Sequence, residues 1–294
     1  MLMQEIKQNK LYTPKLDIIF QVLFGEPDSQ KITKDLLEKI LGVKIEKVDL
    51  SKNPILRREF PKDKLGILDV IVEIDEKESC DLEMQVVENE NIIKRILYYW
   101  GKLYTRNLKA GEDFGELKRT IVILIADFEV KGLEEQGYHS KWKIIEEKQR
   151  KLILTQHLEI HIIEIPKKYK KMENDKENKL KEWLSFLENP ESEEVLYYMK
   201  NNENIKSAKE KLNTLSEDER VRRLAELREK AIMDEKEAKY TGYTEGRREG
   251  REEGRKQGKE ATKKEIAKKM KEEKIGTEII VEVTGLTKED IDKL

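Results

Sequence analysis

The sequence predicts an α/β fold, in which a mixed β-sheet is flanked by helices and followed by a charged helical extension at the carboxyl-terminal end. Two observations predict the sheet. Residues 67–74 and 80–87 alternate apolar and polar side chains across a short charged turn, and residues 120–128 (TIVILIADF) form an apolar run rich in β-branched residues. The third observation predicts the extension, because the chain is 41 % charged and the charges crowd the region beyond Pro166.

Two short helices open the predicted fold, on either side of a break at residues 25–27 (GEP). Their apolar positions recur at a spacing of three and four residues, at Phe20, Leu23 and Phe24 in the first helix and at Ile32, Leu36, Leu37, Ile40 and Leu41 in the second. Asp28 or Ser29 can cap the second helix and Gly42 can end it. Residues 43–51 then read as a strand.

Beyond the hairpin, the sequence predicts a helix over residues 92–111, the buried strand at 120–128 and a further strand at 158–165. The buried strand is typical of a sheet that is covered on both faces. Helices and strands that alternate in this order favour an α/β domain built on a mixed sheet.

Charge and cysteine content narrow the classes of function. The 59 basic residues nearly cancel the 61 acidic ones, so any nucleic-acid site has to be a local basic patch. The single cysteine, Cys80, excludes an intramolecular disulfide and a thiolate zinc site. His157 and His161 are four residues apart in a segment that alternates like a strand, so we expect edge or surface histidines rather than a metal cluster.

The opening residues, MLMQEIKQNK, turn polar at once and do not resemble a signal peptide. No apolar run approaches the roughly 20 residues that a membrane span needs. We therefore expect a soluble, cytoplasmic protein with no membrane partner.

The composition suggests four segments: a core at residues 1–166, a charged helical region at 167–240, a glycine-rich segment at 241–260 and a small helical segment at 261–294. In the last of these, Thr287 is expected to cap a final helix that follows Gly285.

The glycine-rich segment repeats glycine at every fourth position, at Gly242, Gly246, Gly250, Gly254 and Gly258. Each glycine costs a helix about 1 kcal/mol relative to alanine. One interpretation is a close helix–helix contact that makes homo-oligomers. The other is a weakly helical, solvated linker.

The hairpin carries acids on one face. If its apolar face is common to both strands, Val70 pairs with Leu82, and Asp69 then lies opposite Glu83 with Cβ atoms about 5 Å apart. Two like charges at that distance need compensation, which a divalent cation such as Mg²⁺ supplies. The alternative is a solvated hairpin face, although Ile67 and Ile71 on the same face indicate that it is partly covered.

Several blocks together resemble one family. These are PKLDIIFQVLFG, ILDVIVEID followed by CDLEMQ, RILYYWGKLYTRNLKAGEDFGELKRTIVILIADF, and the glycine-repeat tail. In this order they look like the Rpn family of recombination-promoting nucleases, which are also labelled transposases, in the PD-(D/E)XK nuclease superfamily. The resemblance covers nearly the whole chain.

This resemblance implies a restriction-endonuclease-like core and an endonuclease that cleaves DNA with Mg²⁺, or with Mn²⁺ in its place. It implies that Asp69 and Glu83 bind the metal and that the backbone carbonyl of Met84 can add a ligand. Gln85 takes the place of the usual lysine, and it cannot supply that lysine's positive charge. Asp17 matches an acidic position that supports the metal or a bound water.

Positive side chains near these acids are candidate DNA contacts. Lys15 is a candidate phosphate contact, whereas Gln21 stands where the family commonly has lysine. In the helix at residues 92–111, Arg95 and Tyr99 are candidates to reach DNA. The alternative for the aromatic residues of this helix is packing against the sheet, which we favour for Tyr98, Trp100 and Tyr104.

Two functions from different classes therefore stand beside each other. The first is a Mg²⁺-dependent DNA endonuclease. The second is a catalytically weak DNA-binding or assembly protein that oligomerises through its tail. A third interpretation makes the tail a regulatory element that binds a partner.

Overall fold

A computed structural model describes residues 11–51, 70–106, 108–109, 111–169 and 180–294. Contacts divide the chain into two units, Met1–Ala231 (unit 1) and Ile232–Leu294 (unit 2). Unit 1 contains the whole described sheet and the helices that cover it.

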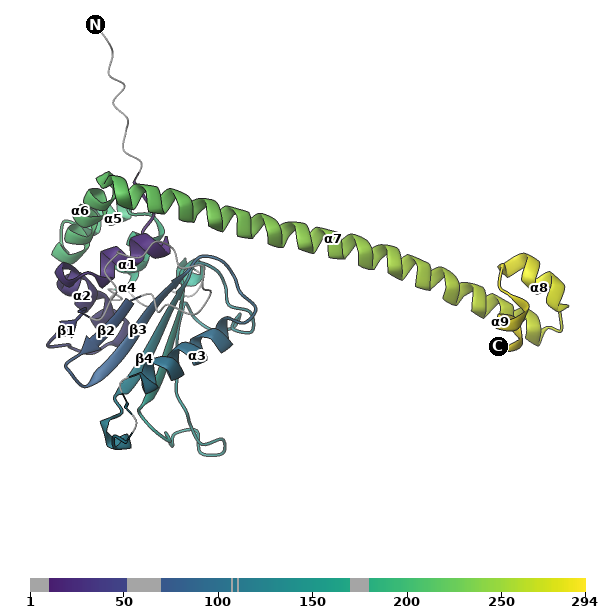
Figure 1. Ribbon diagram of the computed structural model, residues 1–294, viewed down its shortest axis with the longest axis horizontal. Helices are drawn as coiled ribbons and strands as arrows, with labels where there is room; N and C mark the ends of the chain where they lie inside the picture. The colour runs from purple at the N-terminus through teal and green to yellow at the C-terminus, as the bar shows by residue number, and fades with distance from the viewer. Residues whose placement is uncertain (1–10, 52–69, 107, 110, 170–179) are drawn as a thin grey trace, which may run out of the picture. The chain divides into compact units, whose positions relative to one another are not determined.

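The six described strands of unit 1 form one mixed sheet (Figure 1). Their bounds are Val48–Asp49 (β1), Val70–Ile74 (β2), Glu78–Gln85 (β3), Arg119–Ala126 (β4), His139–Trp142 (β5) and Leu158–Glu164 (β6). The order across the sheet is β1-β2-β3-β4-β6-β5, with β3, β4 and β6 parallel and the other pairs antiparallel. After Arg119, every residue of β4 is buried, which confirms the prediction of a strand covered on both faces.

Nine α-helices are described. Their bounds are Asp17–Gly25 (α1), Gln30–Leu41 (α2), Ile92–Thr105 (α3), Leu180–Glu188 (α4), Glu193–Tyr198 (α5), Glu203–Glu217 (α6), Glu219–Glu272 (α7), Thr277–Thr284 (α8) and Lys288–Asp292 (α9). Short 3-10 turns stand at Pro27–Ser29, Phe114–Glu116 and Ile165–Tyr169. The mixed sheet with flanking helices and a helical carboxyl-terminal extension is the predicted fold class.

The β2–β3 hairpin has the register predicted from its alternation. Val70 pairs with Leu82 and Val72 pairs with Cys80. Three residues, 75–77, connect the paired residues Ile74 and Glu78. Asp75 and Glu76 have φ values of 49° and 61°, the left-handed conformation that is common in tight hairpin turns. The Asp75 carboxylate holds this turn by accepting hydrogen bonds from the backbone N–H groups of Glu46 (3.0 Å) and Lys47 (2.7 Å).

Helix α3 covers one face of the sheet. A core cluster joins it to β4 and β6 through Ile92, Ile96, Val122, Leu124, Ile160 and Ile162. Nearer the hairpin, Tyr99 and Leu103 of the same helix pack against Ile71 of β2. The hairpin face that carries Ile71 is therefore covered, as its apolar residues indicated.

Helix α1 contacts the hairpin strands β2 and β3. The hairpin residues that point away from α3 are almost completely buried, with exposed fractions of 0–2 % at Val70, Val72, Cys80, Leu82 and Met84. Helix α1 contributes buried aromatic rings as well, and the centroids of Phe20 and Phe24 lie 4.7 Å apart. The hairpin is consequently fixed from both sides.

The charged region beyond residue 180 packs back onto the amino-terminal helices. The indole of Trp183 in α4 is buried, lies 5.7 Å from the ring of Phe24 and donates a hydrogen bond of 2.8 Å to Asp35 in α2. Helix α6 contacts both α1 and α2. These contacts place α4–α6 in unit 1, and the functional boundary expected at residue 166 stays a prediction.

Ser29 stands at the amino-terminal end of α2, but its side chain does not form a cap hydrogen bond. Its hydroxyl accepts a hydrogen bond of 2.7 Å from Lys211 of α6. The predicted stop at Gly42 is confirmed, since Gly42 adopts φ 69° and its N–H bonds the carbonyl of Glu38.

The structure corrects one predicted strand, adds a strand and changes the position of one histidine. The strand expected at residues 43–51 is only the two residues of β1. Strand β5 was not expected at all, and it pairs with β6 along the length of its four residues. His161 is therefore an interior residue with 1 % exposure rather than an edge or surface histidine.

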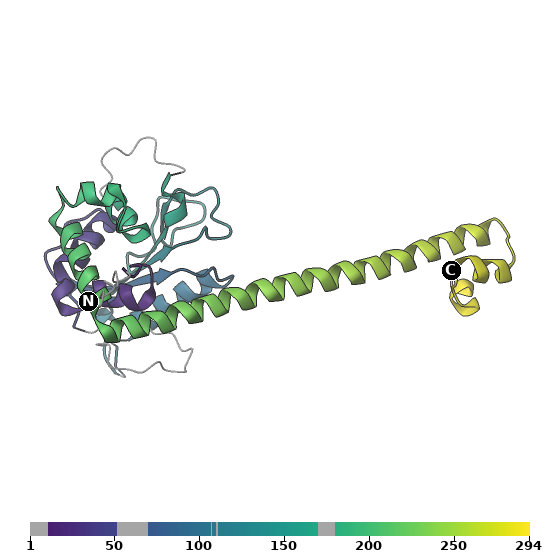
Figure 2. The same ribbon diagram turned by 90° about the horizontal axis from the view of Figure 1, so that it is seen from above.

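Helix α7 runs through 54 residues as one helix, including the whole glycine-repeat segment (Figure 2). Side chains from residue 234 to 261 are exposed. A Cβ atom built on any of its glycines, Gly242, Gly246, Gly250, Gly254 or Gly258, would meet no atom of the described chain within 4 Å beyond the helix's own backbone. Contact between this surface and a second copy stays a proposal.

Unit 2 ends in two short helices that pack against the last turns of α7. Ala267, Ile280, Leu286 and Ile291 form their buried cluster. Gly285 ends α8 at φ 65°, and the Thr287 side chain accepts a hydrogen bond from the N–H of Asp290 at the start of α9, as predicted. Among the described helices, none is both long enough and apolar enough to cross a membrane.

Candidate active site

Two acids of β3 are buried beneath α3. Asp81 and Glu83 share the face of the hairpin that carries Ile71, since side chains alternate along a strand. Their exposed fractions are 0 % and 2 %. The interpretation of a solvated acidic face is therefore wrong for Glu83, and burial of this kind marks a candidate functional site.

Glu83 is in contact with two polar side chains. Gln85 Nε2 donates a hydrogen bond of 3.2 Å to Glu83 Oε2, and Nη2 of Arg95 in α3 lies 3.6 Å from the same oxygen. The Arg95 guanidinium also lies 5.1 Å from the centroid of the Tyr99 ring, a cation–π contact. Gln85 and Arg95, two of the predicted site residues, thus contact the carboxylate of a third, Glu83.

The two candidate DNA contacts of α3 differ in accessibility. The side chain of Arg95 is 34 % exposed, whereas Tyr99 is 5 % exposed. Trp100 packs as expected, stacking on Tyr104 at 4.8 Å and bonding the carbonyl of Thr120. Tyr98, which we expected to pack, is 54 % exposed instead.

Lys15 reaches the same end of the sheet through Asp127, which follows β4. Lys15 Nζ lies 2.8 Å from Asp127 Oδ2, and the Asp127 N–H donates a hydrogen bond of 2.9 Å to the carbonyl of Gln85. This pairing fixes the segment before α1 next to the carboxyl end of β3.

Asp17 is the first residue of α1, where a negative charge favours the helix dipole. Its carboxylate Oδ2 lies 2.5 Å from Nε of Arg228 in α7, and its Oδ1 accepts the N–H of Ile18 at 2.8 Å. In this conformation Asp17 therefore binds an arginine, and its role beside a metal stays a prediction.

Asp69, the predicted partner of Glu83, lies outside the described residues. The register that predicted the pairing is confirmed on the described side, where Val70 stands opposite Leu82. The Met84 side chain is 2 % exposed, and the role of its backbone carbonyl stays a prediction.

Sequence reasoning missed Asp81, Asp127 and Arg228. Asp127 had a usable signal, because an acid that directly follows a buried strand lies at the carboxyl edge of the sheet, beside the end of β3. Arg228 had none, since its partner Asp17 is 211 positions away in the chain.

The described donors suit a hard divalent cation. Glu83 offers carboxylate oxygens and its neighbours offer amide and carbonyl oxygens, the ligands that Mg²⁺ prefers while it keeps several waters. Within the described residues, no group of three or more histidine, cysteine or acidic side chains could hold a metal ion. Glu83 together with these oxygens fits an ion that keeps several of its waters.

A second buried polar cluster lies toward the opposite end of the sheet. Glu159 of β6 is 1 % exposed and contacts Arg119 (2.9 Å), Lys141 (2.7 Å) and Lys143 (3.2 Å). Its Oε1 is also 2.9 Å from His161 Nε2. Burial by itself raises the pKa of Glu159, but the hydrogen bonds from His161 and Lys141 and the charge of Arg119 outweigh it and hold that pKa below its usual range.

His139 extends this cluster, with its Nε2 2.8 Å from His161 Nδ1. Burial, and then the charges of His161 and Lys141, lower the pKa of His139 to about 4. The ring is therefore neutral at physiological pH. Because β5 is an unexpected strand, no sequence pattern had placed these two histidines together.

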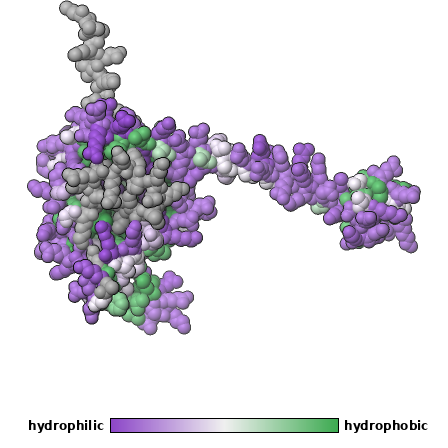
Figure 3. All heavy atoms as spheres, in the orientation of Figure 1, coloured by the Kyte–Doolittle hydropathy of each residue, from purple (hydrophilic) through white to green (hydrophobic). Residues whose placement is uncertain are grey.

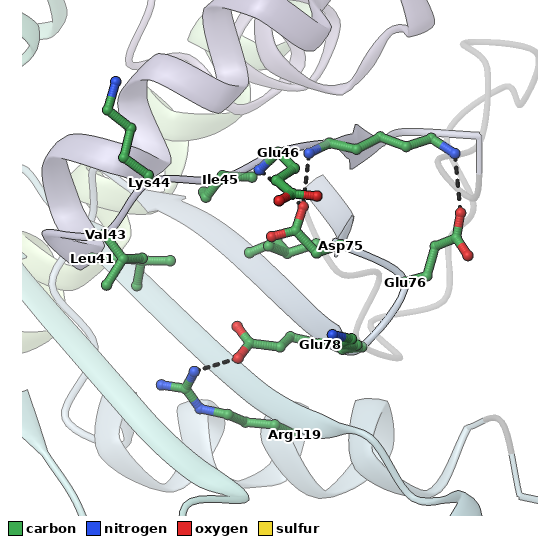
Figure 4. A pocket seen from close by; sticks show the side chains of 12 residues that line it. Leu41, Val43, Lys44, Ile45, Glu46, Asp75, Glu76, Glu78 and Arg119 are labelled. Atoms are coloured by element: carbon green, nitrogen blue, oxygen red, sulfur yellow. Dashed lines mark hydrogen bonds and ion pairs between the residues drawn. The ribbon is translucent and has the colours of Figure 1, made fainter.

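A hollow of about 580 Å³ lies beside the hairpin turn (Figure 4). Glu78 and Arg119 form an ion pair on its wall, and Lys47 lies 3.2 Å from Glu76. The hollow is at the Glu78 end of β3, whereas Glu83 and Gln85 are at the other end. It is therefore separate from the candidate active site.

A mixed sheet flanked by helices, with a buried acid on a hairpin strand, defines a restriction-endonuclease-like α/β protein. The family described as PD-(D/E)XK nuclease family transposase matches residues 14–242. The chain belongs to this family, as the resemblance implied, and membership supports a nuclease-like function. No curated protein and no solved structure matches the chain.

Proposed function

We propose that this protein is a cytoplasmic, divalent-metal-dependent DNA endonuclease that hydrolyses phosphodiester bonds with Mg²⁺, or with Mn²⁺ in its place. One observation supports the proposal above others. Glu83 is 2 % exposed at the carboxyl end of a hairpin strand, in a chain of the PD-(D/E)XK nuclease family. Buried ionisable side chains cluster at functional sites, so a buried carboxylate at this place in a nuclease fold favours a role in catalysis.

Glu83 and Asp69 would hold the ion through their carboxylates, with the Met84 carbonyl as a further oxygen ligand. When bound, such an ion activates a water and neutralises charge on the phosphate. Arg95 lies 3.6 Å from Glu83, so it offsets the carboxylate's charge in the protein without metal.

Gln85 stands in the motif position that usually holds lysine. Its amide lies 3.2 Å from Glu83, where it can orient a water or a phosphate oxygen but cannot provide positive charge. We propose that Arg95 provides that charge, because it is one third exposed and its planar group binds phosphate oxygens in pairs. Tyr99 would act with it by holding the guanidinium in place.

Two amino-terminal residues complete the proposed site. Lys15 is paired with Asp127 and is 18 % exposed, so it would exchange this partner for a DNA phosphate. Asp17 would support the ion or its water after release from Arg228. In both cases an ion pair of the free protein breaks when DNA binds, so the site is complete only in the presence of the substrate.

The test is cleavage of supercoiled plasmid with Mg²⁺, with Mn²⁺ and with EDTA, using wild type, Asp69→Ala and Glu83→Gln. Glu90→Gln is the matched control, because Glu90 is exposed and only seven positions away. We expect metal-dependent nicking that falls by about 10²-fold or more in both site variants and is unchanged in the control. Equal nicking by wild type and Glu83→Gln would exclude Glu83 from catalysis.

A gain-of-function variant tests the role of position 85. Gln85→Lys restores the usual cation beside Glu83, so we expect faster cleavage at the same metal concentration. Arg95→Gln should slow wild type more than it slows Gln85→Lys, because the new lysine replaces the lost charge. Equal losses in the two backgrounds would show that Arg95 does not substitute for the lysine.

The second candidate function is a DNA-binding or assembly protein with weak catalysis, and the absence of the motif lysine at Gln85 is the observation that favours it. DNA binding without cleavage, in every metal, would support this function.

We also propose that the glycine surface of α7, formed by Gly242, Gly246, Gly250, Gly254 and Gly258, makes homo-oligomers. Deleting residues 242–294 should then lower the number of chains in each particle, measured from its mass in solution, and leave the fold of unit 1 intact.

A further inference from the structure

Residues 142–156 leave the sheet as a two-stranded ribbon between β5 and β6. Ile145 and Ile153 pair in antiparallel orientation. On either side of this pair, the N–H of Glu146 donates to the carbonyl of Leu152 (2.9 Å) and the N–H of Leu154 donates to the carbonyl of Ile144 (3.1 Å). The segment is therefore an ordered hairpin, called the ribbon below.

The stem of the ribbon is apolar and exposed. Its large apolar side chains keep from 36 to 77 % of their surface accessible: Trp142 40 %, Ile144 39 %, Ile145 45 %, Leu152 54 %, Ile153 36 % and Leu154 77 %. Figure 3 shows an apolar region at the lower edge of unit 1, next to hydrophilic atoms. A cluster of this kind marks an interaction surface.

Both faces of the ribbon contribute to this surface, because side chains alternate along each strand. Ile145 and Ile153 share one face, and Ile144 and Leu154 share the other. A partner therefore meets exposed apolar side chains on either face of the ribbon.

The tip of the ribbon is mixed in charge. Residues 146–151 read EEKQRK, so two acids precede three cations. The Glu146 carboxylate accepts the N–H of Gln149, and no ion pair joins any of these five charged side chains to another described residue. The tip offers both signs of charge to a partner.

This charge pattern decides between two occupants. On DNA, the two acids would cancel most of the three cations, so the tip would neutralise about one phosphate and gain little affinity. Against a second copy related by a two-fold axis, each surface meets itself, and the acids of one ribbon can face the cations of the other. The apolar stem with a mixed-charge rim is also the usual anatomy of a protein–protein interface.

We propose that the ribbon is a two-fold interface between two copies of this chain, separate from the glycine surface of α7. Glu146 and Glu147 of one copy pair with Arg150 and Lys151 of the other, while the apolar stems pack together. The ribbon extends from β5, which is the edge strand of the sheet. The second copy would also shield that edge, which proteins generally protect from open-ended pairing.

The test exchanges the charges of the tip in the full chain. The acidic variant is Arg150→Glu with Lys151→Glu, and the basic variant is Glu146→Lys with Glu147→Lys. Each places like charges against like in a two-fold pair, so we expect the dimer dissociation constant, from sedimentation velocity over a concentration series, to rise about tenfold or more. All four substitutions together restore complementary charges and should restore wild-type association.

Mixing the acidic and the basic variants gives a second measurement. Each is weak alone, and native mass spectrometry should show the heterodimer in excess over either homodimer. Association through α7 is the same in every variant, so it cancels from the comparison. Far-ultraviolet circular dichroism confirms that each variant keeps its fold, as expected for substitutions at exposed positions.

Two results would overturn the proposal. One is identical self-association in wild type and in both single-sign variants. The other is failure of the fourfold variant and of the mixture to recover association. If the basic variant instead binds duplex DNA more tightly and the acidic variant binds it less tightly, with no change of mass, the ribbon contacts DNA. None of these readouts depends on nuclease activity.

Discussion

Replacing Glu159 by glutamine tests whether the buried cluster of β6 stabilises unit 1. The substitution keeps the shape of the side chain and removes a charge that contacts Arg119, Lys141 and Lys143. Breaking a fully buried ion pair costs about 3–5 kcal/mol, because it leaves the partner charge without compensation.

The expected cost for Glu159→Gln is smaller, for reasons visible in the partners. The side chains of Lys141 and Lys143 are 42 % and 23 % exposed, so both can turn to water, and exposed pairs contribute only about 0–1 kcal/mol each. Arg119 keeps its ion pair with Glu78. The remaining loss of stability comes mainly from Arg119 and from His161, which is buried. We expect the free energy of unfolding to fall by about 2–3 kcal/mol.

Tryptophan fluorescence in urea measures this loss in unit 1 alone, because all three tryptophans, Trp100, Trp142 and Trp183, lie before residue 232. With a slope of about 2–3 kcal/mol per molar urea, the midpoint should fall by about 1 M. Glu90→Gln, an exposed glutamate, is the control and should leave the midpoint unchanged. A Glu159→Gln midpoint equal to that of the control would refute the reasoning, since the cluster would then contribute nothing to stability.

Three further outcomes are expected for unit 1. Cys80 is 0 % exposed, and its burial, followed by the nearby acids, raises the pKa of its thiol. It should therefore resist a thiol-specific disulfide reagent until the protein is unfolded in urea. Rapid labelling of the folded protein would contradict this prediction. Gly42→Ala should cost about 1 kcal/mol, because Gly42 has φ 69° and a side chain disfavours that conformation. Gly101→Ala, inside α3 with open space around the added Cβ, should instead raise the urea midpoint, and the same sign for both would refute the conformational argument. For His139, the folded pKa of about 4 lies below its value of 6.5 in the unfolded chain, so the unfolded state binds more protons between these values and stability should fall as pH drops from about 6.5 to about 4. His139→Gln should flatten this dependence in urea titrations at a series of pH values, and an unchanged slope would assign it to another group.

Elements with a strong local pattern were predictable. The hairpin register followed from the two-residue alternation of Val70 and Val72 against Leu82 and Cys80, and β4 followed from its unbroken apolar run. The stop of α2 at Gly42 followed from glycine's access to positive φ. In each case the signal and the structure it specifies lie within a few residues of each other.

Elements that depend on distant partners were not predictable. Strand β5 has the polar sequence HSKW, and it is a strand because β6 pairs with it. Ser29 fits the sequence of a cap, but Lys211 arrives from a helix 182 positions away and takes its hydroxyl. In the candidate site, Glu83 and Gln85 came from the motif, whereas Asp127 and Arg228 join Lys15 and Asp17 only through the tertiary fold.

The long-range contacts of α1 bear on the order in which this chain can fold during synthesis. The N–H of Tyr12 donates to the Ser216 hydroxyl, and Asp17 binds Arg228. These late partners therefore exist only after more than two hundred further residues have left the ribosome. At a synthesis rate of about 5–20 residues per second, that delay is on the order of ten seconds or more, and α1 lacks its contacts with α6 and α7 for that time. We therefore expect newly made chains that stop short of residue 228 to leave these surfaces of α1 exposed and to be targets for chaperones.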